Sequence, residues 1–149
     1  MIDDILTKVE LHLKRAKLAL LEIKTWENID TGIFEDFSKI KTIDTFIYRF
    51  IKLQDLMGDK LFKIFLNEIG EYKDNMSLLD SVDKLEKLEL INSSQDWMEY
   101  RKLRNKLTHE YPDNEDEILD GIKIALEYFD NMEKILENIR NYKNLKMLQ

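Results

Sequence analysis

The sequence predicts an all-α protein, a five-helix up-and-down bundle. Proline occurs once and glycine four times in 149 residues. Leu, Ile, Lys and Glu repeat along the whole chain, a composition typical of a helical protein. Apolar residues recur at steps of three and four, the spacing that places them along one side of a helix. At this length we expect a single domain, residues 1–149, whose core forms without disulfides or a structural metal.

The apolar spacing and the residues that end helices divide the chain into five expected helices. They cover residues 3–28, 34–72, 78–91, 94–110 and 115–144. The polar stretch before Gly32 ends the first helix. Pro112 ends the fourth, because it lacks an N–H and disfavours a helical conformation in the residue before it. Ser77 and Asp80 have the spacing of a cap at the start of the third helix.

The second expected helix is long and apolar on two adjoining faces. It would be about 58 Å long if straight, so we expect a bend near Gly58 or a projection beyond the monomer. The chain's other helices could surround this helix on most sides. A two-fold partner could also cover its second face, and the two interpretations are compatible. Arg49 is a charged residue within this helix and should find a partner or a ligand, which makes it a candidate contact for RNA or another protein.

Composition excludes several classes of function and location. The chain has no cysteine, which excludes disulfides, thiol catalysis and cysteine-bound zinc. Its start lacks the basic and apolar parts of a secretory leader, and no apolar run approaches the roughly 18 residues of a membrane span. We therefore expect a cytoplasmic protein that does not contact the membrane. A net charge of −7 means that any RNA contact depends on a local basic patch.

Residues 100–112 contain such a patch. They hold four of the 23 basic residues and one of the two histidines, His109. The guanidinium of arginine offers a fixed fork of donors that suits a phosphate, and histidine titrates near neutrality. Arg104 and His109 are therefore candidates to hold a phosphodiester and to move protons around it. Arg101 and Lys106 are candidate phosphate contacts beside them.

Helical geometry separates the two main candidates. Five residues place Arg104 and His109 about 140° apart around an ideal helix, so they do not share a face. Asn105 and His109, four residues apart, do share one, so Asn105 can orient the imidazole or add a phosphate donor. Arg104 and His109 could reach one substrate if the helix unwinds before Pro112, or if a two-fold axis brings in the neighbouring copy.

These residues resemble a known motif. Arg104-Asn105-x3-His109 is similar to the Arg-x4–6-His signature of HEPN domains. With Tyr111 it resembles the Arg-x4-His-x-Tyr form of HepT-type toxins, from HEPN/minimal-nucleotidyltransferase toxin–antitoxin systems. The five-helix layout, with the motif late in the fourth helix, is similar as well. The resemblance thus covers nearly the whole chain and implies a bundle of the HEPN / nucleotidyltransferase-substrate-binding-subunit type.

The resemblance implies a metal-independent endoribonuclease toxin of a type VII-like pair, with no cofactor. In that role His109 would be the general base or acid and Arg104 would position the phosphate, supported by Asn105, Arg101 and Lys106. It further implies a homodimer with the motif at its interface. The cognate minimal nucleotidyltransferase antitoxin would transfer AMP to Tyr111, and the added anion would exclude the phosphate of the RNA substrate.

Other interpretations of the same residues remain open. His109 could only cap its helix, and the arginines could form a solvated face. The chain could be a non-catalytic substrate-binding or interaction subunit of a nucleotidyltransferase, which its acidic composition favours, or a helical scaffold. His12 has no motif around it and is expected to be structural, while Trp97 and Tyr100 are expected in the core. No metal-binding spacing involves the two histidines, and the glycines form no phosphate-binding loop.

Overall fold

The protein is all-α in a computed structural model that describes residues 1–109 and 114–148, with side chains described as far as Lys146. The described helices are α1 (Ile2–Ile23), α2 (Phe37–Leu56), α3 (Phe62–Glu68), α4 (Leu78–Lys87), α5 (Ser94–His109) and α6 (Glu115–Leu148). A 3₁₀ turn, η1 (Thr31–Glu35), precedes α2, and a π turn, η2 (Met57–Leu61), joins α2 to α3. Because α2, η2 and α3 follow one another without a break, the described chain contains five helical segments, as predicted.

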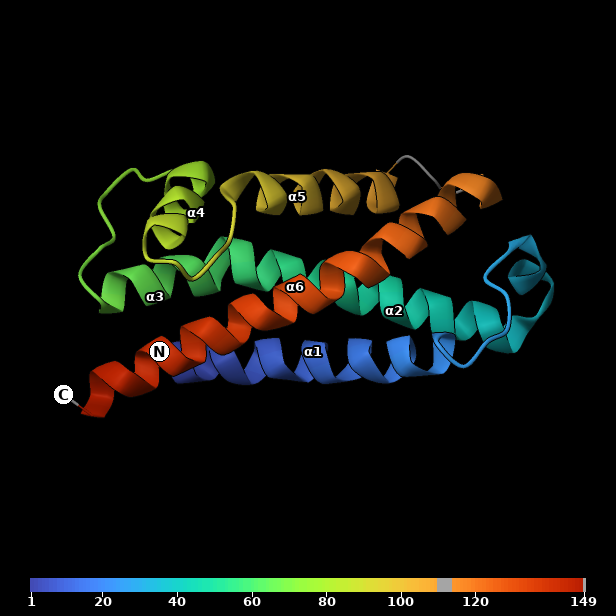
Figure 1. Cartoon of the computed structure of the whole chain (residues 1–149), viewed down its shortest axis with the longest axis horizontal. Helices are drawn as coiled ribbons and strands as arrows, with labels where there is room; N and C mark the ends of the chain where they lie inside the picture. The colour runs from blue at the N-terminus through green and yellow to red at the C-terminus, as the bar shows by residue number, and fades with distance from the viewer. Residues whose placement is uncertain (110–113, 149) are drawn as a thin grey trace.

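The long segments alternate in direction, as an up-and-down bundle requires (Figure 1). α1 and the α2–α3 segment lie antiparallel, and both ends of the chain lie at the same end of the molecule. α5 runs above α2, and α6 crosses back diagonally over the bundle (Figure 1). The short α4 lies between α3 and the start of α5. α5, which carries the predicted site, is therefore packed against both α2 and α6.

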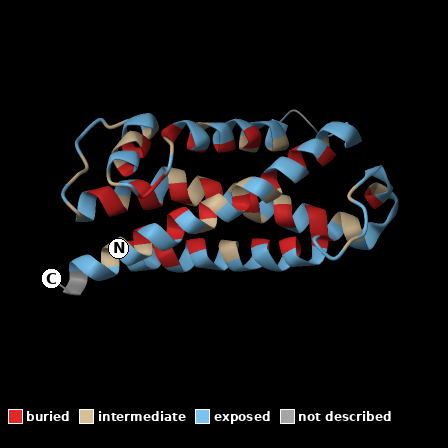
Figure 2. Cartoon of the chain, in the orientation of Figure 1, coloured by how far each residue is buried: buried red, intermediate tan, exposed pale blue. Residues whose placement is uncertain are grey.

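The α2–α3 segment forms the centre of the core (Figure 2). Its buried apolar side chains are Ile43, Phe46, Phe50, Leu53, Met57, Leu61, Phe62, Phe65 and Leu66. They join one hydrophobic cluster with buried residues of α1, α4, α5 and α6. The chain's own helices thus bury one apolar face of this segment. The adjoining face stays partly open, because Ile40, Ile47, Ile51 and Ile64 are half-buried and Phe37 is 68% exposed. Burial of these nine side chains, together with the rest of the cluster, is the main force that holds the bundle together.

Near Gly58, where we expected a bend, the segment contains the π turn η2. A π turn inserts one extra residue into a helix and is often found at functional sites. Gly58 faces the Trp97 indole of α5, because a Cβ placed on Gly58 would lie 3.4 Å from Trp97 Cζ2 and 3.5 Å from Nε1. The missing side chain leaves space between α5 and the central segment.

Three of the predicted helices are longer than the structure shows. The central α2–α3 segment spans 37–68 instead of 34–72. α1 and α4 end early because the chain turns back onto the core. α1 ends at Ile23, five residues before the expected 28, so that Trp26 and Ile29 can pack against the core. α4 ends at Lys87 instead of residue 91. After it, Glu89 adopts a φ of 62°, and the Leu90 N–H donates to the Leu85 carbonyl at 2.9 Å, the 6→1 bond of a Schellman motif.

The other helix ends follow the sequence more closely. The predicted cap of α4 is confirmed, since the Ser77 and Asp80 side chains each accept a hydrogen bond from the other's backbone N–H. α3 ends before Gly70, whose φ of 77° suits glycine. α6 begins at residue 115 as expected, with Asn114 Oδ1 accepting from the Glu117 N–H at 3.0 Å, and it continues four residues beyond the expected 144. In residues 1–109 and 114–148, every helix is too short or too polar to cross a bilayer.

Candidate functional site

α5 is fixed to the bundle by three side chains at steps of three. Trp97, Tyr100 and Leu103 are buried, which confirms that the two aromatic residues belong to the core. The Trp97 ring meets the Phe62 ring edge-to-face at a centroid distance of 4.7 Å, and the Asn131 amide of α6 bonds the Tyr100 hydroxyl. This anchoring turns the adjoining edge of α5, which carries the arginines, toward α2.

Arg104 makes a bidentate ion pair with Asp55 of α2. Its Nε donates to Asp55 Oδ1 at 2.9 Å and its Nη2 donates to Oδ2 at 2.9 Å. The two side chains are 24% and 33% exposed, so water screens the pair only in part. The hydrogen bonds that Arg104 donates to Asp55 raise the pKa of Arg104 above its ordinary value, against the opposing effect of burial. The guanidinium is therefore charged and held in one orientation.

The ion pair leaves part of the Arg104 guanidinium available to a ligand. A guanidinium carries five N–H donors, and Asp55 takes one from Nε and one from Nη2. Nη1 faces Asn105, whose amide oxygen lies 3.4 Å away, at the long limit of a hydrogen bond. In this structure Asn105 is thus directed toward Arg104, although it shares a helix face with His109. The remaining donors can bind a phosphate oxygen.

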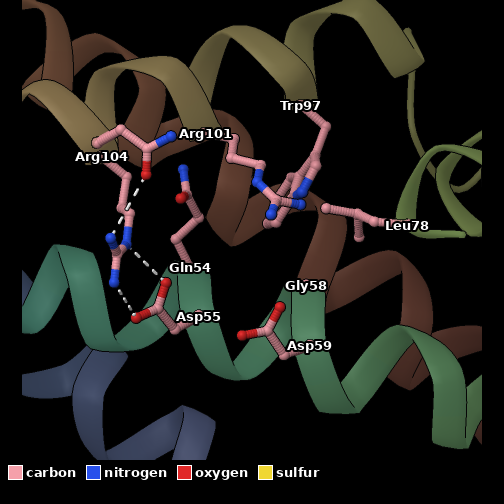
Figure 3. Close-up of a pocket in the computed structure, with 9 residues that line it drawn as sticks. Gln54, Asp55, Gly58, Asp59, Leu78, Trp97, Arg101 and Arg104 are labelled. Carbon is pink, nitrogen blue, oxygen red and sulfur yellow. Dashed lines mark hydrogen bonds and ion pairs between the residues drawn. The ribbon is translucent and has the colours of Figure 1, made fainter.

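Arg104 lies at a polar pocket between α5 and the junction of α2 with η2 (Figure 3). The pocket has a volume of about 200 Å³ and is lined by Gln54, Asp55, Gly58, Asp59, Leu78, Trp97, Arg101, Arg104 and Asn105. Six of these nine side chains are charged or carry an amide. Asp55 and Asp59 lie on the α2–η2 side, whereas Arg101 and Arg104 come from α5 (Figure 3). The four formal charges in the pocket sum to zero.

Gln54 is the most deeply buried polar residue of the pocket. It is 3% exposed, and its side-chain nitrogen is buried with no hydrogen-bond partner among the described residues. Its side chain extends from α2 toward α5, between Asp55 and Arg101 (Figure 3). An unsatisfied buried amide is unfavourable for stability. A group that accepts a hydrogen bond in the pocket would satisfy it.

The structure brings together only part of the predicted site. Arg101, Arg104 and Asn105 line the pocket, while Lys106 and His109 are exposed on α5 and lie outside its lining. α5 stays helical through His109, so the separation of about 140° between Arg104 and His109 persists within one chain. Arg104 and His109 could meet through unwinding of the helix or through a second copy of the chain. α5 shows no unwinding as far as His109, where the described segment ends. Tyr111 lies outside the described residues.

Sequence reasoning missed the residues that α2 and η2 contribute to the pocket. Asp55 and Asp59 are four residues apart, and Gln54 adjoins them. A signal was present, because these polar residues and Gly58 interrupt a long apolar helix. Their link to α5 was not visible, since Asp55 and Arg104 lie 49 residues apart along the sequence.

Arg49, the other charged residue singled out in the second helix, has a partner within the chain. Its Nη1 lies 3.0 Å from His12 Nδ1 of α1, and its guanidinium lies over the Tyr48 ring at 5.1 Å. Burial lowers the pKa of His12, and the charges of Arg49, Lys52 and Arg15 lower it further. A neutral His12 can accept from Arg49, so this pair accounts for the arginine without a ligand.

In residues 1–109 and 114–148, no three His, Asp or Glu side chains gather as a metal site requires. The pocket around Arg104 therefore offers arginine, carboxylate and amide groups as its chemistry. No protein-family model matches the chain, and no curated protein is similar to it. The candidate site thus rests on the residues of this chain and their geometry.

Proposed function

We propose that this protein is an endoribonuclease of the HepT type, whose cleaving site combines Arg104 with His109. The observation that carries the proposal is the bidentate Arg104–Asp55 pair. It holds a charged guanidinium at the mouth of a polar pocket and leaves donors for a phosphate, as the positioning of a scissile phosphodiester requires. The motif Arg104-x4-His109-x-Tyr111 supports the same function by resemblance.

The proposed reaction uses the 2′-hydroxyl of the RNA. The 2′-oxygen forms a bond to phosphorus while the bond from phosphorus to the 5′-oxygen breaks. His109 either takes the proton of the 2′-hydroxyl or gives a proton to the leaving 5′-oxygen. Arg104 neutralises the charge that develops on the non-bridging oxygens. Because DNA lacks the 2′-hydroxyl, the protein should not cut it.

The geometry of α5 favours a site made from two copies of the chain. His109 is exposed and turned about 140° from Arg104 on a continuous helix. A two-fold axis close to the end of α5 would bring His109 of one copy to Arg104 of the other. The proposal therefore includes a homodimer, with two equivalent sites at the seam and Lys106 beside the incoming phosphates.

Cleavage of a labelled RNA by the purified protein tests this function. We expect the wild type to cut the RNA in the presence of EDTA and to leave the matching DNA intact. His109→Ala and Arg104→Ala should each reduce the rate by about a hundredfold or more. Lys102→Gln is the matched control, because it removes an exposed charge from the same helix, outside the pocket. Intact RNA with every variant, including the wild type, would refute the nuclease.

A nucleotidyltransferase partner completes the proposal. The phenol oxygen of Tyr111 would bond to the α-phosphorus of ATP as pyrophosphate leaves, and the bound AMP would exclude RNA by charge and bulk. Because the RNA substrate and the ATP-dependent partner occur there, we assign the activity to the cytoplasm. Incubation with the partner and ATP should add the mass of AMP to the peptide that contains Tyr111. An adduct on another residue, or none, would contradict this control.

The second candidate is a non-catalytic subunit of a nucleotidyltransferase. The same ion pair favours it in one respect, since Asp55 already occupies two of the donors of Arg104 and gives that residue a structural role. Such a subunit would bind the enzyme without cutting RNA. Expression of the wild type and of His109→Ala without a partner separates the two. Slower growth and degraded RNA with the wild type alone support the nuclease, and equal growth supports the subunit.

A further inference from the structure

The pocket beside Arg104 has chemistry that phosphate binding does not use. Its formal charges cancel, with Asp55 and Asp59 opposite Arg101 and Arg104, so it has no excess positive charge to attract an anion into its interior. Asp55 and Arg104 neutralise each other directly. The groups that remain are a carboxylate, a guanidinium and a buried amide. This set suits a neutral ligand that both donates and accepts hydrogen bonds.

Three of the charged or amide groups in the lining make no ion pair or side-chain hydrogen bond among the described residues. They are the carboxylate of Asp59, the guanidinium of Arg101 and the side-chain nitrogen of Gln54. Gln54 is the strongest indication of a ligand, because its nitrogen is buried and nothing described accepts its hydrogens. Gly58 adds space at the junction of α2 and η2, where a side chain would approach the Trp97 indole.

Among nucleobases, guanine matches these groups best. Its N1–H and N2 amino group are adjacent donors that pair with the two oxygens of one carboxylate. Its O6 and N7 are adjacent acceptors that match an arginine fork. Adenine, cytosine and uracil each lack the paired donors. Asp59, on the α2–η2 side of the pocket, can accept from the donor edge of the base. Arg101 of α5 and Gln54 of α2 can donate to its acceptor edge (Figure 3).

We propose that this pocket binds a guanine base of the RNA substrate and gives the nuclease a preference for cutting beside guanosine. The inference rests on the proposed function for its substrate, and on the Gln54, Asp59 and Arg101 geometry for the base. Arg104 lies at the same pocket, so a nucleotide seated there carries its phosphate to the free donors of that guanidinium. Base binding thereby selects which phosphodiester meets His109.

Binding is measured apart from cleavage. The probes are the four 5′-monophosphates of guanosine, adenosine, cytidine and uridine, titrated against the intact protein by calorimetry or by Trp97 fluorescence in a Trp26→Phe background. The guanosine nucleotide should bind at least about tenfold more tightly than the others. Inosine monophosphate, which lacks the N2 amino group, and the 7-deaza analogue, which lacks N7, should each lose most of that advantage. Equal affinity for all four nucleotides, or no binding, overturns the proposal.

Substitutions in the pocket test which side chain contacts which edge of the guanine base. Asp59→Asn should weaken guanosine binding by about tenfold and inosine binding by less, because inosine keeps only the N1–H donor. Arg101→Gln should likewise weaken binding of the 7-deaza analogue less than binding of guanosine, because that analogue keeps only the O6 acceptor. Gln54→Leu removes the buried donor and should also weaken binding. Lys102→Gln, on the same helix and outside the pocket, should bind as the wild type does. Circular dichroism confirms that each variant folds, and a folded Asp59→Asn with unchanged guanosine preference contradicts the assignment.

Different results would refute the guanine pocket and the proposed nuclease. RNA cleavage with no dependence on the neighbouring base would refute the guanine pocket and leave the nuclease intact. Guanosine binding without cleavage would refute the nuclease and leave the pocket intact. An RNA library sequenced after partial cleavage reports the first outcome, and the nucleotide titrations report the second.

Discussion

Asp55 is the residue that determines how Arg104 is presented. Replacing it with asparagine keeps the shape but removes the charge and one of the two acceptors. We expect Asp55→Asn to lower the free energy of unfolding by about 1 kcal/mol, because the pair is partly screened by water. Urea denaturation measures this. Cleavage should fall as well, since Arg104 would no longer be held in one orientation.

A more exposed ion pair provides the control for that change. Lys17 and Glu133 meet through one 2.9 Å contact, and Lys17 is 48% exposed. Glu133→Gln should therefore cost less stability than Asp55→Asn and leave cleavage unchanged. If Asp55→Asn and Glu133→Gln lose the same stability, and Asp55→Asn cleaves RNA as fast as the wild type, the Arg104 pair has no special role.

His12 makes stability depend on pH. Burial, together with Arg49, Lys52 and Arg15, lowers the pKa of His12 below its ordinary value of 6.5. Below about pH 6.5 the unfolded chain therefore binds a proton at this position more readily than the folded chain, and the free energy of unfolding falls as the solution is acidified. His12→Asn keeps an acceptor for Arg49 and does not titrate. Chemical denaturation between about pH 7.5 and pH 5 should show a shallower decline for this variant, and an identical decline would contradict the argument.

One substitution at the end of α4 should make the protein more stable. Glu89 occupies the left-handed region at a φ of 62°, a conformation that favours glycine after a helix. Glu89→Gly should raise the free energy of unfolding by about 0.5–1 kcal/mol, because it removes this backbone strain. Glu89→Ala is the control and should not stabilise the protein. Thermal denaturation compares the two, and a lower melting temperature for the glycine variant would refute the argument.

The same helix shows why some helix ends were predictable and others were not. The start of α4 followed from Ser77 and Asp80, whose mutual hydrogen bonds are local and visible in the spacing. Its end was missed because Glu89, which favours no turn by itself, is held in the left-handed region by the Schellman bond to Leu85. α1 was likewise predicted too long, since its end depends on Trp26 packing against distant residues of the core.

Part of the candidate site could likewise be predicted from the sequence, and part could not. The basic edge of α5 was predictable because Arg101, Arg104 and Asn105 are close together in sequence and follow a recognisable motif. The acidic and amide groups of α2 were not, because only the packing of two helices brings Asp55 to Arg104 across 49 residues. Periodicity identifies which face of a helix is buried, but it does not identify which polar residue of another helix meets that face.

At the scale of the whole molecule, the net charge of −7 limits how the proposed RNA substrate could be bound. A surface that repels phosphates in general cannot hold a long RNA by its overall field. Recognition must then come from a few contacts at one place, where Arg101, Arg104 and Lys106 lie on α5. A two-fold seam at the end of α5 would double that local positive charge and would bring His109 from the second copy.

A mixing experiment tests the two-copy site. In a dimer of one Arg104→Ala chain and one His109→Ala chain, one site has lost both residues, and the other combines the intact Arg104 with the intact His109. Equal amounts of the two inactive variants, allowed to exchange subunits, form such dimers half of the time, so activity should return to about a quarter of the wild-type rate. If each site lay within one chain, every site in the mixture would lack a residue and no activity would return. Covalently linked mixed dimers remove any dependence on exchange, and their inactivity would rule out the seam while leaving the Arg104–Asp55 pocket unaffected.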